Sequence, residues 1–274
     1  MKKLLLILLC LPLLFTTCKK ETEEIEEAKT YVPDDNFEAY LEDNGMGDGI
    51  ANNNYVLTSQ LNAYVSPLLN ISGLEISDLT GIEEFINISW LQCSDNQLTS
   101  LDVSKNTALT MLHCYGNNIT HLDLKENTML QTLHCYDNQL QSLNLTNCTL
   151  LKTLWAHNNN LTLFGVLDNP LLETLWVQNN NLEFLNLNYH SLLVELNCRQ
   201  NNLQSLSLIH CINLTNFSCQ NNQLTYLNIK NGNNQNIISF LPDGNWNLTC
   251  IGVDNESWNW PLIQSNQYFS EDCP

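Results

Sequence analysis

The chain has 274 residues, and 43% of them are hydrophobic, which is enough for a buried core. It carries 10 Lys plus Arg against 29 Asp plus Glu, so its net charge is −19. This balance argues against a nucleic-acid-binding protein, because phosphate binding needs clustered cations, and the charged fraction of only 14% leaves a surface whose polarity comes mainly from Asn, Gln, Ser and Thr.

Residues 1–17 predict an export signal. Two lysines precede an apolar run from Leu4 to Phe15, which is too short for a membrane span and ends in two threonines. Cys18 follows directly, and its position resembles the lipobox of bacterial lipoproteins. The resemblance implies that residues 1–17 are removed, that Cys18 is lipidated and that the protein is anchored in the outer membrane. Ordinary secretion with an incidental Cys18 is the alternative.

Residues 18–32 are charged and almost free of aromatic side chains, so they cannot bury enough apolar surface to fold. We expect an acidic, disordered tether here. Its opening, Lys-Lys-Glu-Thr-Glu-Glu, is similar to the lysine-then-acid signals that send lipoproteins of Bacteroidota-like bacteria to the outer face of the cell. A plain linker explains the same residues equally well.

An N-terminal cap is predicted for residues 33–68. Asp35 and Glu38 have capping-box spacing ahead of an apolar face, and Gly45 is a helix stop, so we expect a short amphipathic helix between them. The segment from Asp43 to Asn54 is rich in side-chain oxygens of the kind that bind calcium. It lacks the spacing and the terminal Glu of an EF-hand, which favours a flexible turn.

Residues 69–231 repeat themselves. After a first, longer unit that begins at Leu69, seven units follow with a period of 21 residues, as the positions of Cys93, Cys114 and Cys135 show. Each of the seven has an asparagine three residues after that position, at Asn96, Asn117, Asn138, Asn159, Asn180, Asn201 and Asn222. A buried amide at this point satisfies the backbone groups of a turn, so the repeat predicts a short inward-facing strand followed by a turn.

The unit, L-x-C-x-x-N-x-L-x-x-L-x-L, closely resembles the leucine-rich repeat family. The resemblance implies a right-handed solenoid with a parallel β-sheet on its concave face, capped at both ends. The first unit is similar to an internalin-like repeat, residues 232–274 resemble a C-terminal cap, and most of the chain is similar to surface lipoproteins of the flavobacterial type. The return segments have no 3.6-residue period, so we expect an extended or 3₁₀ convex side.

The chain contains 11 cysteines. Five of them belong to the inward column, where a free thiol packs as a small apolar residue: Cys93, Cys114, Cys135, Cys198 and Cys219. Cys148 and Cys211 share another column but lie three repeats apart, roughly 14 Å, which is too far for a bond. Cys250 and Cys273 remain, and we predict that they form a disulfide that closes the C-terminal cap.

On each repeated strand, the residues between the inward positions point to the concave face. Two columns there contain seven rings, which we call the aromatic strip: His113, His134, Trp155, Trp176, Tyr115, Tyr136 and His157. Exposed rings often anchor binding surfaces, so the strip and Arg199, which continues one column, form the candidate ligand site. Alternatively, the rings only stabilise one another across neighbouring strands. The strip lacks the cysteine or carboxylate cluster of a typical zinc site, so no metal is expected.

The sequence contains no nucleophile elbow, phosphate loop or metal-hydrolase motif, which argues against an enzyme and against a cofactor. The leading hypothesis is a lipid-anchored surface module that binds an extended ligand on its concave face. Neutral polar side chains beside rings suit a glycan, whereas acidic rims and exposed rings suit another protein. A structural or adhesive envelope spacer without a specific ligand is the rival hypothesis.

Overall fold

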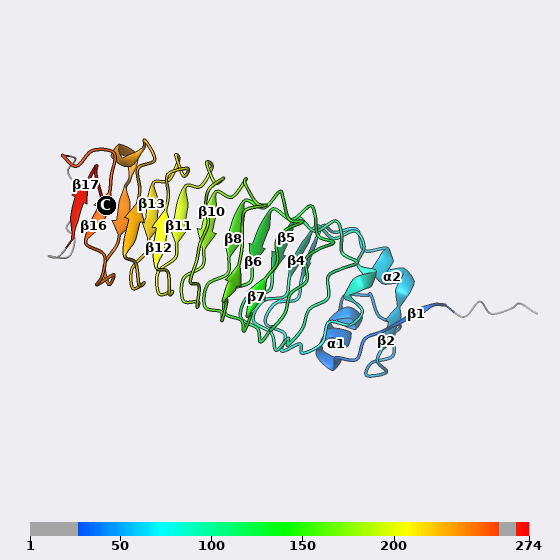
Figure 1. The fold of residues 1–274 in the computed structure, drawn as a ribbon. Helices are drawn as coiled ribbons and strands as arrows, with labels where there is room; N and C mark the ends of the chain where they lie inside the picture. The colour runs from blue at the N-terminus through cyan, green and yellow to red at the C-terminus, as the bar shows by residue number, and fades with distance from the viewer. Residues whose placement is uncertain (1–26, 258–266, 274) are drawn as a thin grey trace, which may run out of the picture.

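Each repeat contributes one short strand to a nine-stranded parallel sheet, and successive turns stack into an elongated solenoid (Figure 1). The computed structural model describes residues 27–257 and 267–273. The strands of the sheet follow one another in chain order: β3 (Leu68–Asn70), β4 (Trp90–Gln92), β5 (Met111–His113), β6 (Thr132–His134), β8 (Thr153–Trp155), β10 (Thr174–Trp176), β11 (Glu195–Asn197), β13 (Asn216–Ser218) and β15 (Ser239–Leu241).

The strand register places equivalent residues of neighbouring repeats side by side. Leu112 on β5 pairs with Leu133 on β6, which pairs in turn with Leu154 on β8, and all three side chains are fully buried. The cysteines that follow these strands are also fully buried as free thiols, which confirms the predicted core column. Burial raises the pKa of Cys114 to about 12, so this thiol stays protonated and apolar.

The sheet is one strand longer than the sequence analysis predicted. Phe240 on β15 pairs with Phe217 on β13, and its buried ring stacks on that of Phe217 at 4.4 Å between centroids. The predicted C-terminal cap, residues 232–274, therefore contains a further turn of the solenoid. The sequence analysis missed it because a 3₁₀ helix, η2 (Asn234–Asn236), lengthens this turn and moves its strand off the 21-residue period.

The return side of the solenoid is extended, as predicted, with tight turns and no α-helix among its described residues. Many of these turns close with hydrogen bonds of the 3₁₀ type, such as Asn106 N–H to the carbonyl of Val103 at 3.0 Å. The first repeat contains a 3₁₀ helix, η1 (Ile82–Glu84). Short parallel strands also pair here: β7 (Ser142–Leu143) with β9 (Leu163–Phe164), and in a second sheet β12 (Ser205–Ser207), β14 (Tyr226–Asn228), β16 (Cys250–Gly252) and β17 (Tyr268–Ser270).

The N-terminal cap covers the first turn with four elements: β1 (Lys29–Tyr31), α1 (Asp35–Asp43), β2 (Tyr55–Leu57) and α2 (Thr58–Asn62) (Figure 1). The predicted capping helix is confirmed, but its capping residues differ. Asp34, not Asp35, is the N-cap and accepts two backbone N–H groups of the first turn. Glu38 does not close a capping box, because its carboxylate accepts the N–H groups of Asn53 and Asn54 at 3.0 and 3.1 Å.

Helix α1 ends at Asp43, and the predicted stop, Gly45, follows the C-cap with a left-handed φ of 72°. The N–H of Gly45 donates to Glu42, and that of Met46 donates to Leu41, which together form a Schellman motif. At the other end of the helix, the second carboxylate oxygen of Asp34 accepts the N–H and hydroxyl of Ser77 at 2.7 and 2.8 Å. One side chain thus caps the helix and attaches it to the first repeat.

The folded domain begins earlier than expected. Strand β1 lies within residues 18–32, for which a disordered tether was predicted, and it pairs antiparallel with β2. Val32 is fully buried and Thr30 is nearly so, because both face the cap. The tether prediction is therefore wrong for the end of that range, whereas residues 18–26 lie outside the described residues.

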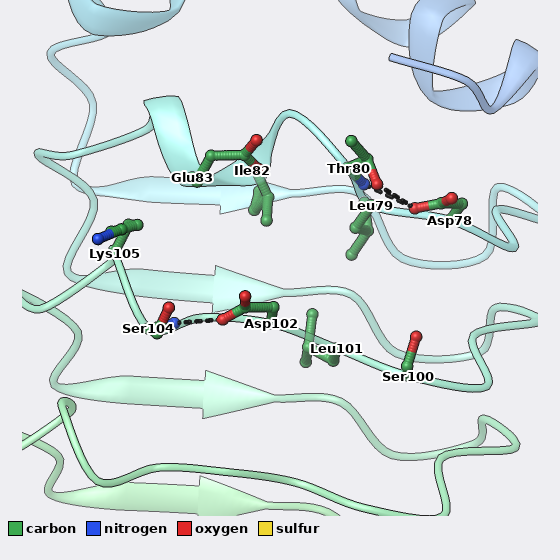
Figure 2. Close-up of a pocket in the computed structure, with 10 residues that line it drawn as sticks. All are labelled: Asp78, Leu79, Thr80, Ile82, Glu83, Ser100, Leu101, Asp102, Ser104 and Lys105. Carbon is green, nitrogen blue, oxygen red and sulfur yellow. Dashed lines mark hydrogen bonds between the residues drawn. The ribbon is translucent and has the colours of Figure 1, made fainter. Parts of the chain in front are cut away.

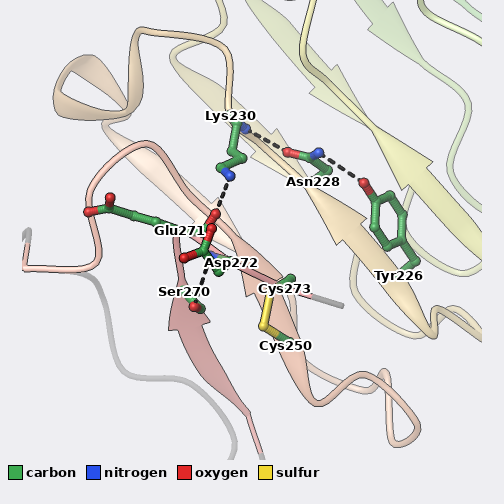
Figure 3. The surroundings of a disulfide bond; sticks show 8 residues. All are labelled: Tyr226, Asn228, Lys230, Cys250, Ser270, Glu271, Asp272 and Cys273. Atoms are coloured by element: carbon green, nitrogen blue, oxygen red, sulfur yellow. Dashed lines mark hydrogen bonds between the residues drawn. A yellow bond between two sulfur atoms is a disulfide. The ribbon is translucent and has the colours of Figure 1, made fainter.

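The predicted disulfide is confirmed at the C-terminal cap (Figure 3). Cys250 on β16 is bonded to Cys273, and their Cα atoms are 5.7 Å apart. The bond fixes the strand pair β16 and β17 at the end of the solenoid. Lys230 supports the same turn, since its ammonium group donates to the carbonyl oxygen of Glu271.

The repeated asparagines form a ladder inside the turns. Asn138 is typical: its amide donates to the carbonyls of Cys135 in its own turn and Cys114 in the preceding turn, and its oxygen accepts the N–H of Ile119 at 2.9 Å. Asn245 continues this ladder in the lengthened turn, where it bonds to Cys219 and Leu224. Each member therefore ties two successive turns together.

A second ladder, which the sequence analysis missed, runs along the return side. Its members are fully or almost fully buried and reach carbonyl oxygens of the preceding turn. They are Asn106, Asn127, Cys148, Asn169, His190 and Cys211. Different side chains make the same contact here, because each can direct an N–H or S–H group at a carbonyl.

Candidate functional site

The aromatic strip lies on the outward face of the nine-stranded sheet, as predicted. Its first row consists of the last residues of four strands, namely His113, His134, Trp155 and Trp176. Its second row follows two residues further along the chain and consists of Tyr115, Tyr136 and His157. All seven side chains are partly buried, so the strip is covered at its base and open above.

The rings of each row stack face to face. In the first row the centroids of His134 and Trp155 are 4.0 Å apart and their planes differ by 3°, and Trp155 and Trp176 follow at 4.6 Å and 8°. His113 stacks on His134 at 4.2 Å. The spacing follows from the strands, which lie about 4.8 Å apart. Each inner ring therefore has both faces covered and directs an edge to solvent.

The second row is built in the same way. Tyr136 stacks on Tyr115 at 4.4 Å and 5°, and on His157 at 4.4 Å and 7°. Tilted contacts join the two rows, for example between Tyr136 and Trp155 at 6.2 Å and 51°. The strip is thus one continuous body of rings, which agrees with the expectation that neighbouring rings stabilise one another.

A row of left-handed residues holds the turns beside the strip. Asp137, Asn158 and Asn179 have φ values of 51°, 52° and 56°, a conformation that Asp and Asn tolerate better than most residues. The amide of Asn158 donates to Asp137 at 2.6 Å, and that of Asn179 donates to Asn158 at 2.5 Å. This rim keeps successive strand ends in register, which positions the rings above them.

Buried polar atoms without a hydrogen-bond partner are concentrated on this face. In the described part of the chain, eight of them belong to the outward columns of the sheet: Trp90 Nε1, Ser94 Oγ, His113 Nε2, His134 Nε2, Trp155 Nε1, His157 Nδ1, Trp176 Nε1 and Gln178 Oε1. Each such atom costs about 1–3 kcal/mol relative to a paired one. The outward face of the sheet therefore has a local cost in stability that the other described faces do not share to the same extent.

The histidines of the strip are neutral near pH 7. Burial lowers the pKa of His113, and it lowers that of His134 to about 4, where the positive charges of His113 and His157 add repulsion. Burial also lowers the pKa of His157, although Asp137 opposes this effect. Burial, followed by the charge of Tyr115, raises the pKa of Tyr136 to about 12. Neutral rings stack without charge repulsion.

Three residues of this face were not singled out by the sequence analysis. Trp90 meets His113 edge to face, at 5.9 Å and 77°, and extends the strip by one strand. Ser94 and Gln178 occupy the second row before Tyr115 and after His157, and both are buried. Their column positions were visible in the sequence, but their burial was not.

Arg199 lies in the same column beyond Gln178, and it is exposed. It is not part of the ring stack. Its charge is close enough to lower the pKa of His157, after the larger effect of burial. Arg199 takes part in neither of the two ion pairs among the described residues, which join Lys29 to Asp48 and Lys125 to Asp123.

The oxygen-rich loop of the N-terminal cap is held by its own hydrogen bonds. Asp48 pairs with Lys29 at 2.7 Å and accepts the amide of Asn53, and the carboxylate of Glu42 accepts the N–H groups of Asp48 and Gly49. Within residues 27–257 and 267–273, no group of three His, Cys, Asp or Glu side chains is arranged to hold a metal ion.

A hollow of about 290 Å³ lies on the return side, between the first two turns (Figure 2). Asp78 accepts the hydroxyl and N–H of Thr80, and Asp102 accepts the N–H of Ser104. Glu83 accepts the N–H of Gly81 at 2.8 Å. Each of these carboxylates bonds to its own local turn, so together they do not form a binding site.

None of the described helices has the length and apolar character that a membrane crossing requires. Cys18, the predicted lipidation site, lies outside the described residues.

The solenoid is similar to solved leucine-rich repeat structures, although no protein-family model and no curated protein sequence matches the chain. Internalin C2 from Listeria monocytogenes is 22% identical, with a TM-score of 0.65 over 79% of this chain and 99% of that one. The functional domain of InlJ from the same bacterium, described as including a cysteine ladder, is 24% identical, with a TM-score of 0.50 over 83% of this chain and 68% of that one.

YopM, a leucine-rich effector protein from Yersinia pestis, is 27% identical, with a TM-score of 0.57 over 65% of this chain. The match spans 49% of the YopM chain. These likenesses concern the fold, and together with the stacked strands and asparagine ladder they establish a leucine-rich repeat solenoid. In this chain, Cys93, Cys114 and Cys135 are buried free thiols in equivalent positions of successive turns.

Proposed function

We propose that this protein is an exported surface module that binds an extended segment of another protein on the aromatic strip. The observation that carries the proposal is the concentration of eight unpartnered buried polar atoms on one face of the sheet. A segment of main chain laid across the strip supplies donors and acceptors to such atoms. The rings add apolar area and are the residue types that most often dominate binding energy.

The stacking favours a protein ligand over a glycan. A sugar ring packs on the open face of an aromatic side chain, but the faces of His134 and Trp155 are covered by their neighbours on both sides. The open edges of these rings carry the positive part of the ring quadrupole and attract oxygen atoms. Main-chain carbonyls supply such oxygens at regular intervals.

The spacer hypothesis has one observation in its favour. Because the rings stack on one another, they stabilise the sheet without any ligand. A spacer does not account for the unpartnered atoms of Trp155 and Trp176, since apolar or smaller side chains at these positions would avoid that cost. Binding and spacing therefore make different predictions for variants of these two residues.

We further propose that Cys18 is lipidated and anchors the protein to the outer membrane, facing the exterior. The support is the sequence of residues 1–18 and the lysine-then-acid opening of the mature chain, which is similar to that of flavobacterial-type surface lipoproteins. Mass spectrometry of the membrane-extracted protein checks this. A diacylglyceryl cysteine at the new N-terminus is expected, and a Cys18→Ala variant that stays equally membrane-bound contradicts it.

The binding proposal is tested by panning a random dodecapeptide display library on the full chain, kept in mild detergent, beside a glycan array. The test variant is Trp155→Ala with Trp176→Ala. The matched control is Leu163→Ala with Phe184→Ala, which removes two exposed apolar side chains, 73% and 71% accessible, outside the strip. Peptides that bind the native chain and the control but not the test variant support the proposal.

Two other outcomes contradict it. Strip-dependent binding to glycans without peptide binding replaces the protein ligand by a sugar. Failure of every probe to distinguish the test variant from the control leaves the spacer hypothesis. Circular dichroism of both variants verifies that the solenoid is intact.

A further inference from the structure

We infer that the bound segment places an acidic side chain at Arg199, next to an aromatic or apolar residue at the end of the ring stack. This inference rests on the proposed function, because it assigns the chemistry of one part of the same face. It predicts the class of partner: a protein whose exposed segment combines an Asp or Glu with a neighbouring ring or apolar side chain.

The chemistry of the face changes between β10 and β11. Trp176 is the last ring of the first row, because its register partner on β11 is Asn197. The second row ends at His157 and continues with Gln178 and Arg199. Beyond that point the outward residues of β13 are Asn216 and Ser218. A ligand that follows the sheet therefore passes from rings to a guanidinium group and amides within one strand spacing.

Arg199 is the chain's single arginine, in a protein whose acids outnumber its bases by 29 to 10. Its backbone is fixed, since its N–H donates to the side chain of Asn197 and its carbonyl accepts the N–H of Asn179 at 3.1 Å. Its side chain is exposed and forms no ion pair with a described residue, including Glu195 on the preceding strand β11. An uncompensated arginine that projects from a rigid sheet is suited to bidentate carboxylate binding.

Gln178 supplies the second, independent observation. It is only 6% exposed, and its Oε1 atom is buried without a hydrogen-bond partner. In its column it lies between His157 and Arg199, so a buried acceptor sits beside an exposed group of donors. A single acidic residue matches both, because its main-chain N–H reaches the acceptor while its carboxylate meets the guanidinium group.

The net charge of the protein does not prevent this contact. At physiological ionic strength, charges beyond about 8 Å are largely screened, so most of the acids act weakly at this site. The strip itself is uncharged near pH 7, because burial keeps its histidines neutral. Arg199 is therefore the positively charged group that a ligand meets at the end of the stack.

The test begins with the strip-dependent peptides from the panning experiment on the full chain. Each is measured for affinity to the native protein, to Arg199→Gln and to Lys105→Gln, which removes an exposed cation from the return side as a matched control. We expect the peptides to be enriched in Asp or Glu beside an aromatic or apolar residue. Arg199→Gln should weaken their binding about tenfold, whereas Lys105→Gln should leave it unchanged.

A double-mutant cycle then identifies the pair. Replacing the peptide's acid by its amide should weaken binding to the native protein about tenfold and have little further effect on Arg199→Gln. Arg199→Glu should bind a peptide with lysine in place of the acid better than it binds the original peptide. Strip-dependent peptides that lack acids, or that bind Arg199→Gln as well as the native protein, overturn this inference and leave the proposed function standing. The absence of strip-dependent peptides overturns both.

Discussion

The indole rings of Trp155 and Trp176 stack on adjacent strands, with their centroids 4.6 Å apart and an angle of 8° between their planes. Trp155 is covered on its other face by His134 at 4.0 Å, whereas Trp176 ends the stack. Trp155 is therefore covered by a ring on both faces, whereas Trp176 is covered by a ring on one face only. Trp155 supports the fold through two stacked contacts, and the second face of Trp176 has no stacked ring.

Trp155→Ala should destabilise the protein more than Trp176→Ala. Removal of Trp155 breaks two stacked contacts and leaves a gap inside the row, for which we expect a loss of about 2–4 kcal/mol. Removal of Trp176 breaks one, and about 1–2 kcal/mol should follow. Urea unfolding followed by circular dichroism measures both. Equal losses would mean that the stack adds nothing beyond burial of each ring.

The histidines of the strip should make the folded state less stable in mild acid. Their pKa values in the fold are lowered, to about 4 for His134, while the unfolded chain has the ordinary value of 6.5. Between these values the unfolded state binds more protons, so the free energy of unfolding falls as the pH falls through this window and is unaffected by these groups above it.

Urea midpoints at about pH 7.5 and about pH 5 check this expectation. Carboxylates also begin to titrate in the lower part of this pH range. The native protein is therefore compared with His134→Gln, which removes one histidine and keeps every carboxylate. The variant should show a smaller decline than the native protein. An identical decline in both proteins would assign the pH dependence to the carboxylates alone.

Asn138→Ala should lower the free energy of unfolding by about 1–3 kcal/mol, because it leaves the buried N–H of Ile119 without an acceptor, while the two carbonyls that Asn138 contacts keep the amides of the neighbouring ladder asparagines. Asn160→Ala is the matched control, since this asparagine lies in the next turn but is exposed. Its loss should stay below about 0.5 kcal/mol. Comparable losses for the two variants would show that the ladder has no special role.

The disulfide and the free cysteines should respond differently to reagents. A bond that closes a loop of this length contributes about 3 kcal/mol, so Cys250→Ala with Cys273→Ala should lower stability by that amount. The seven buried thiols should resist alkylation in the native protein and react after denaturation. Peptide mapping by mass spectrometry distinguishes the sites, and labelling of Cys114 under native conditions would contradict the buried column.

The periodic part of the fold was predictable, because the core and asparagine positions recur every 21 residues, and residues that recur at one spacing lie side by side in stacked turns. The ninth strand around Phe240 was not, since one 3₁₀ helix shifts it off the period. The N-cap was misplaced by one residue because Asp35 has capping-box spacing to Glu38, whereas in the structure Glu38 bonds to the loop of the cap and Asp34 both caps the helix and contacts Ser77.

The candidate site was predictable in position but not in geometry. Column positions placed His113, His134, Trp155 and Trp176 side by side, as the structure confirms. Spacing along the chain contains no information on ring torsions, so the face-to-face stacking was not foreseen. The burial of Gln178 was also not foreseen, although its column position between His157 and Arg199 was visible in the sequence.

The asparagine ladder makes a whole turn the smallest piece that the solenoid can gain or lose. Deletion of residues 133–153 would bring Leu154 to the place of Leu133 and let Asn159 take over the bonds of Asn138, whereas a shorter deletion would leave both turns unpaired. The strip shortens by one ring in each row at the same time. Duplication and loss of repeats therefore change the length of the aromatic strip in fixed steps of one strand and leave the contacts of the core unchanged.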